Sequence, residues 1–362
     1  LVPAGLLFAA SCAWLETNLI RAVFRLAEFA SQSFGWPESR RLPFEPHFFN
    51  DEQPARIAME FEVPANPDTD PTIYRYELEA VEDRVVSEVL RIKTSHLFSR
   101  VFERRLGDSG YEVSGVGSRY RDVPPRVSFI AWLARHEITE AKRIVRYFKG
   151  YHSNDFGMVG RVPLVFGLWS AIETYRQDRV SHARMVSMLQ RWDFGLSDVE
   201  YKQSRVTDET FGEQDVWDAV VVHRSDGKTA RLPMLAESSG TAGLFAQLSQ
   251  ILPVLMAGGV AVVDEVESDL HPKMVEVILD LFLNPESNPH DAQLVFSTHA
   301  DWVMNTLNKW SIVLVEKRDC NSAAWRLADI QGVQGRDNHA ARYRAGAYGA
   351  IPRELDEDCQ AN

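Results

Sequence analysis

The spacing of hydrophobic positions divides the first half of the chain into three segments. Residues 17–35 carry apolar side chains at helical spacing, and Thr17 or Asn18 can cap the start of the helix that this spacing predicts. Residues 55–116 hold short strand-like runs separated by proline, aspartate and asparagine, which predicts an antiparallel meander. Residues 126–195 return to helical spacing, so a helical part is expected to follow the β-rich part.

The last third of the chain alternates helical and strand patterns. The expected helices are 241–255, 272–283 and 301–307, the expected strands are 260–263, 293–297 and 311–317, and a hairpin is expected over 217–235. Repeated alternation of this kind implies a parallel sheet. The run from Val260 to Val263 is apolar throughout, which is typical of a central strand that is buried on both faces.

Two acidic residues, Asp264 and Glu265, follow this buried strand directly. Because unpaired carboxylates are costly to bury, we expect them where the strand leaves the core, at the sheet edge where open α/β proteins bind ligands. A magnesium ion held by the aspartate, with the glutamate polarising a water molecule, would explain both acids. A strand that simply ends in a charged turn is the alternative.

Further polar residues are expected at the same edge of the sheet. Residues 236–245 form a small polar turn that starts a helix, which suits a phosphate but is also explained as an ordinary helix cap. His299 ends the next strand on the same side as Glu265, although a histidine in such a place is more often structural. Residues 269–272 follow the acids, and Pro272 opens the next helix.

Composition and charge narrow the classes of function. The 362 residues are 45% hydrophobic and 25% charged, which is ordinary for a globular protein of about two domains. The net charge of -12 argues against a broad face for nucleic acid, which leaves only a local basic patch for that purpose. No apolar stretch reaches the length of about 18 residues that spans a membrane, and three widely separated cysteines suit a reducing cytosol, so we expect a cytoplasmic protein. Because the chain opens on Leu1, we expect it to begin inside a longer protein or to lack its first strands.

In order, the chain reads Ser-Ser-Gly-Thr, helix, apolar strand, Asp-Glu, Asp-Leu-His-Pro, helix, strand, Ser-Thr-His. In this pattern region 232–300 resembles the nucleotide-binding head of ABC/SMC-like ATPases. It resembles in particular the AAA-type ATP-binding proteins of bacterial abortive-infection and anti-phage loci, the RloA/AbiL-type group and its PARIS relatives. The resemblance implies an α/β P-loop NTPase fold with an inserted β-meander plus helical domain. Residues 1–50 and 206–362 would form the head, and 51–205 the insertion.

The resemblance also implies ATP and magnesium as cofactors and assigns roles to the candidate residues. Asp264 would be the Walker B aspartate on the magnesium ion, and Thr17 would be a second magnesium ligand. Thr17 and Asn18 would lie at the nucleotide, directly after the P-loop. Glu265 would be the general base for the attacking water, and His299 would be the switch histidine that senses the γ-phosphate.

A homodimer or higher homo-oligomer is implied by two further motifs. Ser238, Ser239 and Gly240 would form the signature loop, which contacts the γ-phosphate bound on the opposite subunit. Asp269 would belong to the D-loop that crosses the dimer interface. Relatives use ATP-driven assembly to hold or release a toxic nuclease, so the implied partner is an effector protein, a nuclease or toxin from the same locus.

One segment departs from the pattern of the family. The glycines of a P-loop let its backbone wrap the phosphates, and its lysine neutralises them. Residues 8–18 read FAASCAWLETN, without glycine or lysine, and Glu16 stands where the lysine is expected. Three explanations stay open: a degenerate head that binds nucleotide weakly or not at all, an error in the sequence over 9–16, or a segment that does not occupy the P-loop position.

Two functions are therefore compatible with the sequence. The first is a magnesium-dependent ATPase that dimerises around ATP and controls an effector. The alternative is a catalytically degenerate ATPase-fold scaffold or sensor that holds an effector nuclease without turnover. Nuclease activity of this chain itself is disfavoured, because only 63 residues follow His299 and they contain no paired acids on a later strand.

Overall fold

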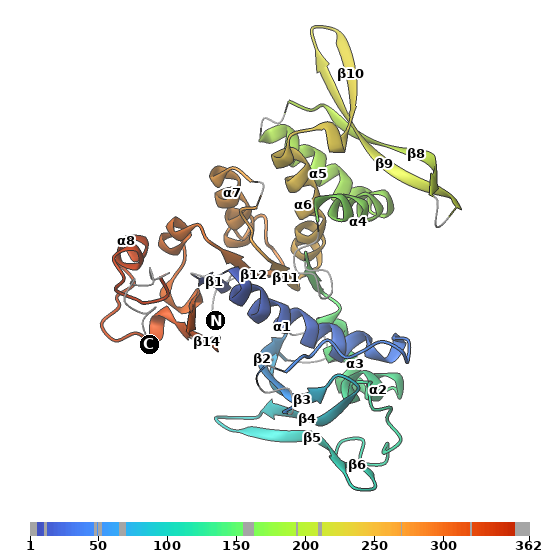
Figure 1. Cartoon of the computed structure of the whole chain (residues 1–362), viewed down its shortest axis with the longest axis vertical. Coiled ribbons are helices and arrows are strands. Elements are labelled where there is room, and N and C mark those ends of the chain that lie inside the picture. Colours follow the sequence, from blue (N-terminus) through green and yellow to red (C-terminus); the bar gives the residue numbers. More distant parts are fainter. Residues whose placement is uncertain are drawn as a thin grey trace, which may run out of the picture. The chain divides into compact units, whose positions relative to one another are not determined.

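The structure is a computed structural model (Figure 1). It describes residues 6–10, 13–46, 49, 53–64, 70–154, 163–192, 195–208, 212–268, 270–318 and 321–351, with only the backbone course over 6–10, 13–16, 206–208, 212–214 and 318. The chain forms two compact units, and the division falls within helix α1 (Ala13–Gln32). Unit 1 contains residues 1–20 and 152–362, and unit 2 contains residues 21–151. These boundaries differ from the expected insertion of 51–205, because the helices after residue 163 pack in the core of unit 1.

Unit 1 is built on a six-stranded sheet with the strand order β14-β13-β1-β12-β11-β7. The strands are β1 (Leu6–Ala10), β7 (Tyr151–Ser153), β11 (Val260–Val263), β12 (Gln293–Thr298), β13 (Ile312–Arg318) and β14 (Asn321–Arg326). The pairs of β1 with β12, β1 with β13 and β11 with β12 are parallel, and β14 adds an antiparallel edge. The expected parallel sheet is therefore confirmed, and so is the burial of all four residues of β11, although this strand lies second from the β7 edge and not at the centre.

Helix α6 is the central helix of unit 1. The helices of this unit beyond α1 are α4 (Leu164–Gln177), α5 (Arg179–Arg191), α6 (Ser239–Ala257), α7 (Pro272–Leu283) and α8 (His339–Arg344). Tyr175 of α4 packs its ring on Phe245 of α6 and donates its hydroxyl to the Phe245 carbonyl at 2.9 Å. Among the described helices, α6 alone is long and apolar enough to cross a membrane by those two criteria, and more than half of it is buried inside the protein.

The C-terminal segment of unit 1 is tied to the residues that follow β12. The helix expected over 301–307 is instead a short 3-10 helix, Asp301–Asn305, in which the N–H groups of Val303 and Thr306 bond the carbonyls three residues before them. Arg344 of α8 forms a two-point ion pair with Asp301, and Asn305 hydrogen-bonds Asn338 at 3.1 Å.

A second, three-stranded sheet of unit 1 consists of β8 (Asp198–Asp208), β9 (Gly212–Ser225) and β10 (Lys228–Pro233). The long strand β9 pairs antiparallel with both neighbours (Figure 1). The turn between β9 and β10 places Asp226 and Gly227 at φ angles of 49° and 74°. Positive φ at both central residues is the geometry of a tight hairpin turn. The expected hairpin is confirmed, whereas β8 was not predicted.

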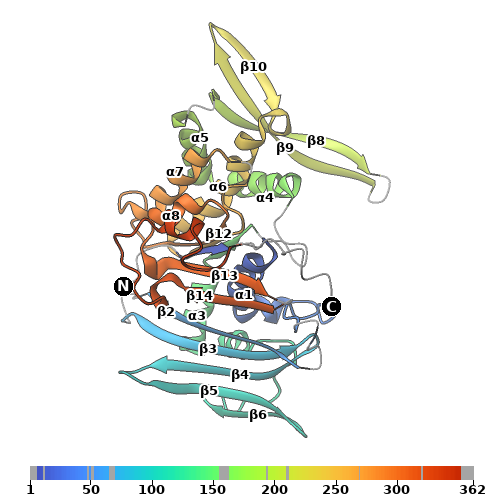
Figure 2. The same ribbon diagram turned by 60° about the vertical axis from the view of Figure 1, so that its left-hand side comes forward.

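Unit 2 contains a five-stranded antiparallel sheet in which each strand pairs with the next (Figure 2). The strands are β2 (Ala55–Val63), β3 (Thr72–Val81), β4 (Arg84–Lys93), β5 (Phe98–Gly107) and β6 (Gly110–Gly115), followed by helices α2 (Phe129–Arg135) and α3 (Thr139–Phe148). Alternate residues of β3 are buried, and Phe61 of β2 packs against Phe148 of α3 with ring centroids 4.6 Å apart. The expected meander is confirmed.

A buried polar network lies in the core of unit 2. Glu88 and Arg104 are both 0% exposed and form an ion pair of 2.7 Å. Tyr76, Ser128 and the backbone N–H of Phe129 also donate to the Glu88 carboxylate, at 2.8–2.9 Å. Burial, followed by the charge of Glu88, raises the pKa of Tyr76 well above its ordinary value, so this hydroxyl stays protonated and donates. The network joins β3, β4 and β5 to the first turn of α2.

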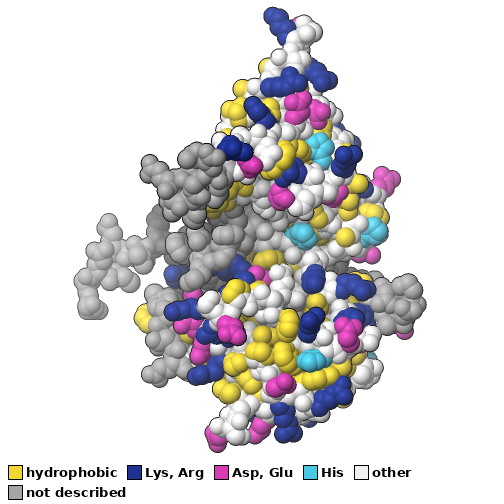
Figure 3. Space-filling model, turned by 90° about the vertical axis from the view of Figure 1, so that its right-hand side faces the viewer, with side chains coloured by type: hydrophobic (Ala, Val, Ile, Leu, Met, Phe, Trp, Pro, Cys, Tyr) yellow, Lys and Arg dark blue, Asp and Glu magenta, His cyan; other side chains and the backbone are white. Residues whose placement is uncertain are grey.

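Arg143, one of the basic residues of α3, makes structural hydrogen bonds. Arg143 donates to the side chain of Thr72 and to the carbonyls of Val63, Pro64 and Asp70, at 2.7–3.2 Å. On the face that Figure 3 shows, basic side chains are scattered among acidic and hydrophobic ones. The Arg143 guanidinium is occupied by contacts within unit 2.

Candidate functional site

The carboxyl ends of β11 and β12 bring Asp264 and Ser297 together. The two strands pair in parallel with Val263 opposite Phe296, so the residue after each lies at the same edge of the sheet. The Ser297 hydroxyl donates to Asp264 Oδ1 at 2.6 Å and accepts the backbone N–H of Glu265 at 2.8 Å. Asp264 is only 3% exposed, so its carboxylate is held by hydroxyl donors in a nearly dry position.

Thr17, near the N-terminal end of α1, contacts the same carboxylate. Its hydroxyl donates to Asp264 Oδ2 at 2.7 Å, across 247 residues of sequence. Magnesium takes oxygen ligands and is usually held by one or two protein groups together with phosphates and water. A hydroxyl and a carboxylate in contact fit that demand. No cluster of three or more His, Cys, Asp or Glu side chains able to hold a metal occurs among the described residues.

Asn154, at the end of β7, fixes the backbone of Asp264. Its side-chain oxygen accepts the N–H of Asp264 at 2.7 Å, and its amide donates to the Asp264 carbonyl at 2.9 Å. Both backbone groups of the residue are thereby satisfied by one side chain. The sequence analysis missed Asn154, because a single asparagine after a short strand carries no periodic signal.

Glu265 occupies an unusual backbone conformation. Its φ of 50° lies in the left-handed region, where a non-glycine residue is uncommon and where strain often accompanies function. Ser268 donates to Glu265 Oε2 at 2.8 Å, and its own N–H bonds the Glu265 carbonyl. The side chain of Glu265 is thus oriented by the turn that follows β11.

His299 is exposed at the end of β12, and its backbone is held by Glu267. The His299 N–H donates to Glu267 Oε1 at 2.6 Å. The other oxygen of Glu267 is buried and has no hydrogen-bond partner in the described part of the chain. Sequence reasoning missed Glu267, although its place in the acidic run after β11 was a signal. Asp269 lies outside the described residues.

The predicted signature residues open helix α6. Ser238 caps the helix by accepting the N–H of Thr241 at 3.1 Å, while Ser239 and Gly240 form the first turn. Ser238 and Ser239 are exposed, so this helix start is accessible to a ligand or partner. Asn18 is also exposed, next to Thr17 on α1.

The connection between β1 and α1 is short. β1 ends at Ala10 and α1 begins at Ala13, so two residues separate the strand from the helix. Counted back from Thr17, a P-loop signature of about eight residues would cover residues 10–17. The structure places 13–17 of this stretch in α1, so the departure from the P-loop pattern in sequence is accompanied by a helix where a loop is expected.

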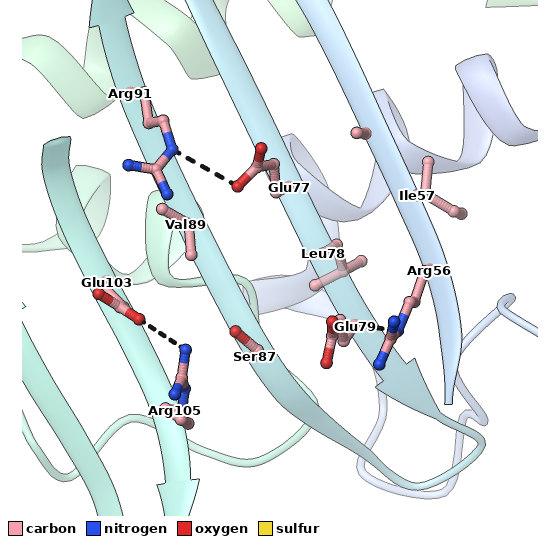
Figure 4. Close-up of a pocket in the computed structure, with 11 residues that line it drawn as sticks. Arg56, Ile57, Glu77, Leu78, Glu79, Ser87, Val89, Arg91, Glu103 and Arg105 are labelled. Atoms are coloured by element: carbon pink, nitrogen blue, oxygen red, sulfur yellow. Dashed lines mark hydrogen bonds and ion pairs between the residues drawn. The ribbon is translucent and has the colours of Figure 1, made fainter. Parts of the chain in front are cut away.

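A shallow hollow of about 340 Å³ lies over strands β2 to β5 of unit 2 (Figure 4). Its arginines and glutamates already neutralise one another: Arg56 pairs with Glu79, Arg91 with Glu77, and Arg105 with Glu103. The hollow is therefore a weaker candidate for a functional site than the edge of the unit 1 sheet.

Comparisons with known proteins found a matching family. A family model described as AAA domain, putative AbiEii toxin, Type IV TA system, matches residues 17–305. A solved structure, titled as the SmcHead bound to the C-winged helix domain of ScpA, is similar at 14% identity and a TM-score of 0.47, covering 90% of this chain and 91% of that chain. No curated protein matches at a significant level. The predicted α/β P-loop NTPase fold is confirmed, and the chain belongs to the family described as AAA domain, putative AbiEii toxin, Type IV TA system.

Proposed function

We propose that this protein is a cytoplasmic head that binds and hydrolyses ATP with magnesium, assembles as a homodimer or higher homo-oligomer around the nucleotide, and controls an effector. The effector would be a nuclease or toxin encoded at the same locus of a bacterial anti-phage system, as in the RloA/AbiL/PARIS-like group. Membership of a family described by a toxin–antitoxin system supports this context.

The contact between Thr17 and Asp264 carries the proposal. A threonine at the start of the helix after β1 and an aspartate at the end of β11 reach within 2.7 Å of each other. These are the two oxygen ligands that a magnesium–nucleotide site needs from the protein. A buried carboxylate with hydroxyl donors on both oxygens is difficult to explain as the end of a charged turn.

The surrounding residues have matching roles. Thr17 and Asp264 would hold the magnesium ion, which when bound neutralises charge on the phosphates. Glu265, oriented by Ser268, would accept a proton from the attacking water. His299, with its backbone fixed by Glu267, would donate to the γ-phosphate.

Three residues, Ser238, Ser239 and Gly240, would complete the site from the opposite subunit. The first of them caps α6, and both serines are exposed on the single chain. A signature loop that acts across a dimer needs that exposure. Asp269 would contribute to the same interface, and Asn18 would lie beside the nucleotide.

A second candidate is the degenerate scaffold or sensor, which holds an effector without turnover. The connection of two residues between β1 and α1 and the acid at position 16 favour it. Without glycine backbone and lysine, the polyphosphate loses most of its cradle. In this second candidate function, the protein keeps its fold and its effector partner but does not hydrolyse ATP.

The experiment that tests the proposal compares Mg-ATP hydrolysis by the wild type, Glu265→Gln and the exposed control Glu286→Gln. We expect turnover in the wild type and in Glu286→Gln. In Glu265→Gln it should fall about 100-fold or more, the contribution of a general base, while nucleotide binding persists. A wild type that neither binds nor hydrolyses ATP would sink the proposal and leave the scaffold.

A further inference from the structure

A histidine of β9 holds the turn that precedes the candidate signature loop. His223 Nε2 lies 2.7 Å from Glu237 Oε1, and His223 Nδ1 lies 2.9 Å from the carbonyl oxygen of Gly195. Glu237 directly precedes Ser238, the cap of α6. One imidazole therefore joins the connection between α5 and β8 to the start of α6.

The two contacts of His223 determine its protonation state. A backbone carbonyl and an ionised carboxylate can only accept hydrogen bonds, and a neutral imidazole has a single N–H to donate. Both contacts are hydrogen bonds only when both ring nitrogens carry a proton. The hydrogen bond to Glu237, followed by that to the Gly195 carbonyl, raises the pKa of His223 above its ordinary value, in agreement with the geometry.

Glu237 is the charged partner of His223, and the residues of β10 beside His223 do not compete for it. Across the β9–β10 ladder, the residue opposite His223 is Ala230, which carries no charge. Arg231 of β10 is engaged by Glu200 at 3.0 Å. The side chains of His223 and Glu237 are 26% and 12% exposed, so the pair is partly shielded from solvent.

We propose that His223 is a positioning residue for the candidate signature loop: the imidazolium ties Glu237, and with it Ser238 at the start of α6, to β9, and deprotonation loosens this turn. The role of Ser238, Ser239 and Gly240 as a signature loop rests on the proposed function, whereas the contacts of His223 with Glu237 and Gly195 do not. Because the pKa is raised in the folded state, the stabilisation is fully present below a pH of about 6.5 and is lost as the pH rises through the raised value. Assembly through this loop should therefore weaken with rising pH.

The tether is tested without nucleotide. NMR titration of histidine-labelled protein, with the signal assigned by His223→Gln, gives the pKa of His223 in the wild type and in Glu237→Gln. We expect Glu237→Gln to lower this pKa. Protection of the Thr241 amide against hydrogen exchange, corrected for intrinsic rates, should fall about fivefold in the wild type when the pH is raised from 6 to 8, since one hydrogen bond is lost. An unchanged pKa in Glu237→Gln, or a protection factor in His223→Gln that keeps the wild-type pH dependence, would overturn the proposal.

A second arm uses analytical ultracentrifugation with Mg-ATP at pH 6 and pH 8. His182, a half-buried histidine of α5 that hydrogen-bonds Tyr201, provides the matched control. We expect association of the wild type and His182→Gln to weaken at pH 8, and association of His223→Gln to lose this pH dependence. If His223→Gln keeps it, the loop role is wrong. If the wild type does not bind ATP at all, the proposed function fails, while the NMR arm still decides the tether.

Discussion

Replacing Asp264 by asparagine is expected to abolish the magnesium-dependent part of nucleotide binding while leaving the metal-free fold intact. Asparagine keeps the shape of the side chain but removes the charge that a magnesium ion needs. Because even indirect supports of a metal site are worth 10–100-fold, loss of a direct ligand should raise the Kd for Mg-ATP by about 100-fold or more. Isothermal titration of the wild type and Asp264→Asn measures this directly.

The same substitution should not destabilise the protein. The Asp264 carboxylate is 3% exposed, and without a cation its burial is costly. We expect the free energy of unfolding of metal-free Asp264→Asn to lie within about 1 kcal/mol of the wild type or above it. Asp280→Asn, the same change at an exposed position of α7, should leave both binding and stability unchanged. Wild-type binding of Mg-ATP by Asp264→Asn would show that the carboxylate is not a ligand.

Substitution of Arg104 by methionine is expected to destabilise unit 2 by about 3–5 kcal/mol, because it leaves the buried carboxylate of Glu88 without its cation. Both side chains are 0% exposed, and Arg104 also donates to the Val127 carbonyl at 2.9 Å. Urea unfolding, monitored by hydrogen exchange of peptides from residues 21–151, measures the stability of this unit separately from the rest of the chain.

The neighbouring Arg105 offers a matched control. Its side chain is 66% exposed, and it pairs with Glu103 on the solvent side of the same strand. Since exposed ion pairs contribute about 0–1 kcal/mol, Arg105→Met should change the unfolding free energy little. Equal effects of the two substitutions would contradict the importance assigned to the buried pair.

Local patterns were sufficient to predict some of the elements around the candidate site, whereas β1 and β7 were not predicted. The apolar run that ends at Val263 and the proline at 272 gave β11 and α7 with the bounds that the structure shows. The strand β8 was not predicted, because its residues are mostly polar and it is stabilised by pairing with β9. Its partner β9 begins only four residues after β8 ends, so the missing signal was a regular alternation of apolar residues within β8 itself.

The site itself was predictable only in part. The order of motifs singled out Thr17 and Asp264, but no spacing rule gives a contact across 247 residues, and it required the parallel neighbours β1, β12 and β11. Asn154 and His223 each act through two hydrogen bonds, Asn154 to the backbone of Asp264, and His223 to one carboxylate and one backbone carbonyl. Isolated polar residues of this kind have no periodicity, so only the folded arrangement identifies them.

The most direct test of the central claim is the magnesium dependence of ATP binding in the wild type and in Thr17→Val, which removes the hydroxyl and keeps the shape. We expect the wild type to bind ATP about tenfold or more tightly with magnesium than with a chelator, and we expect Thr17→Val to lose this difference. A wild type that binds no ATP under either condition, or a Thr17→Val variant with undiminished magnesium dependence, would contradict a nucleotide site built on Thr17 and Asp264.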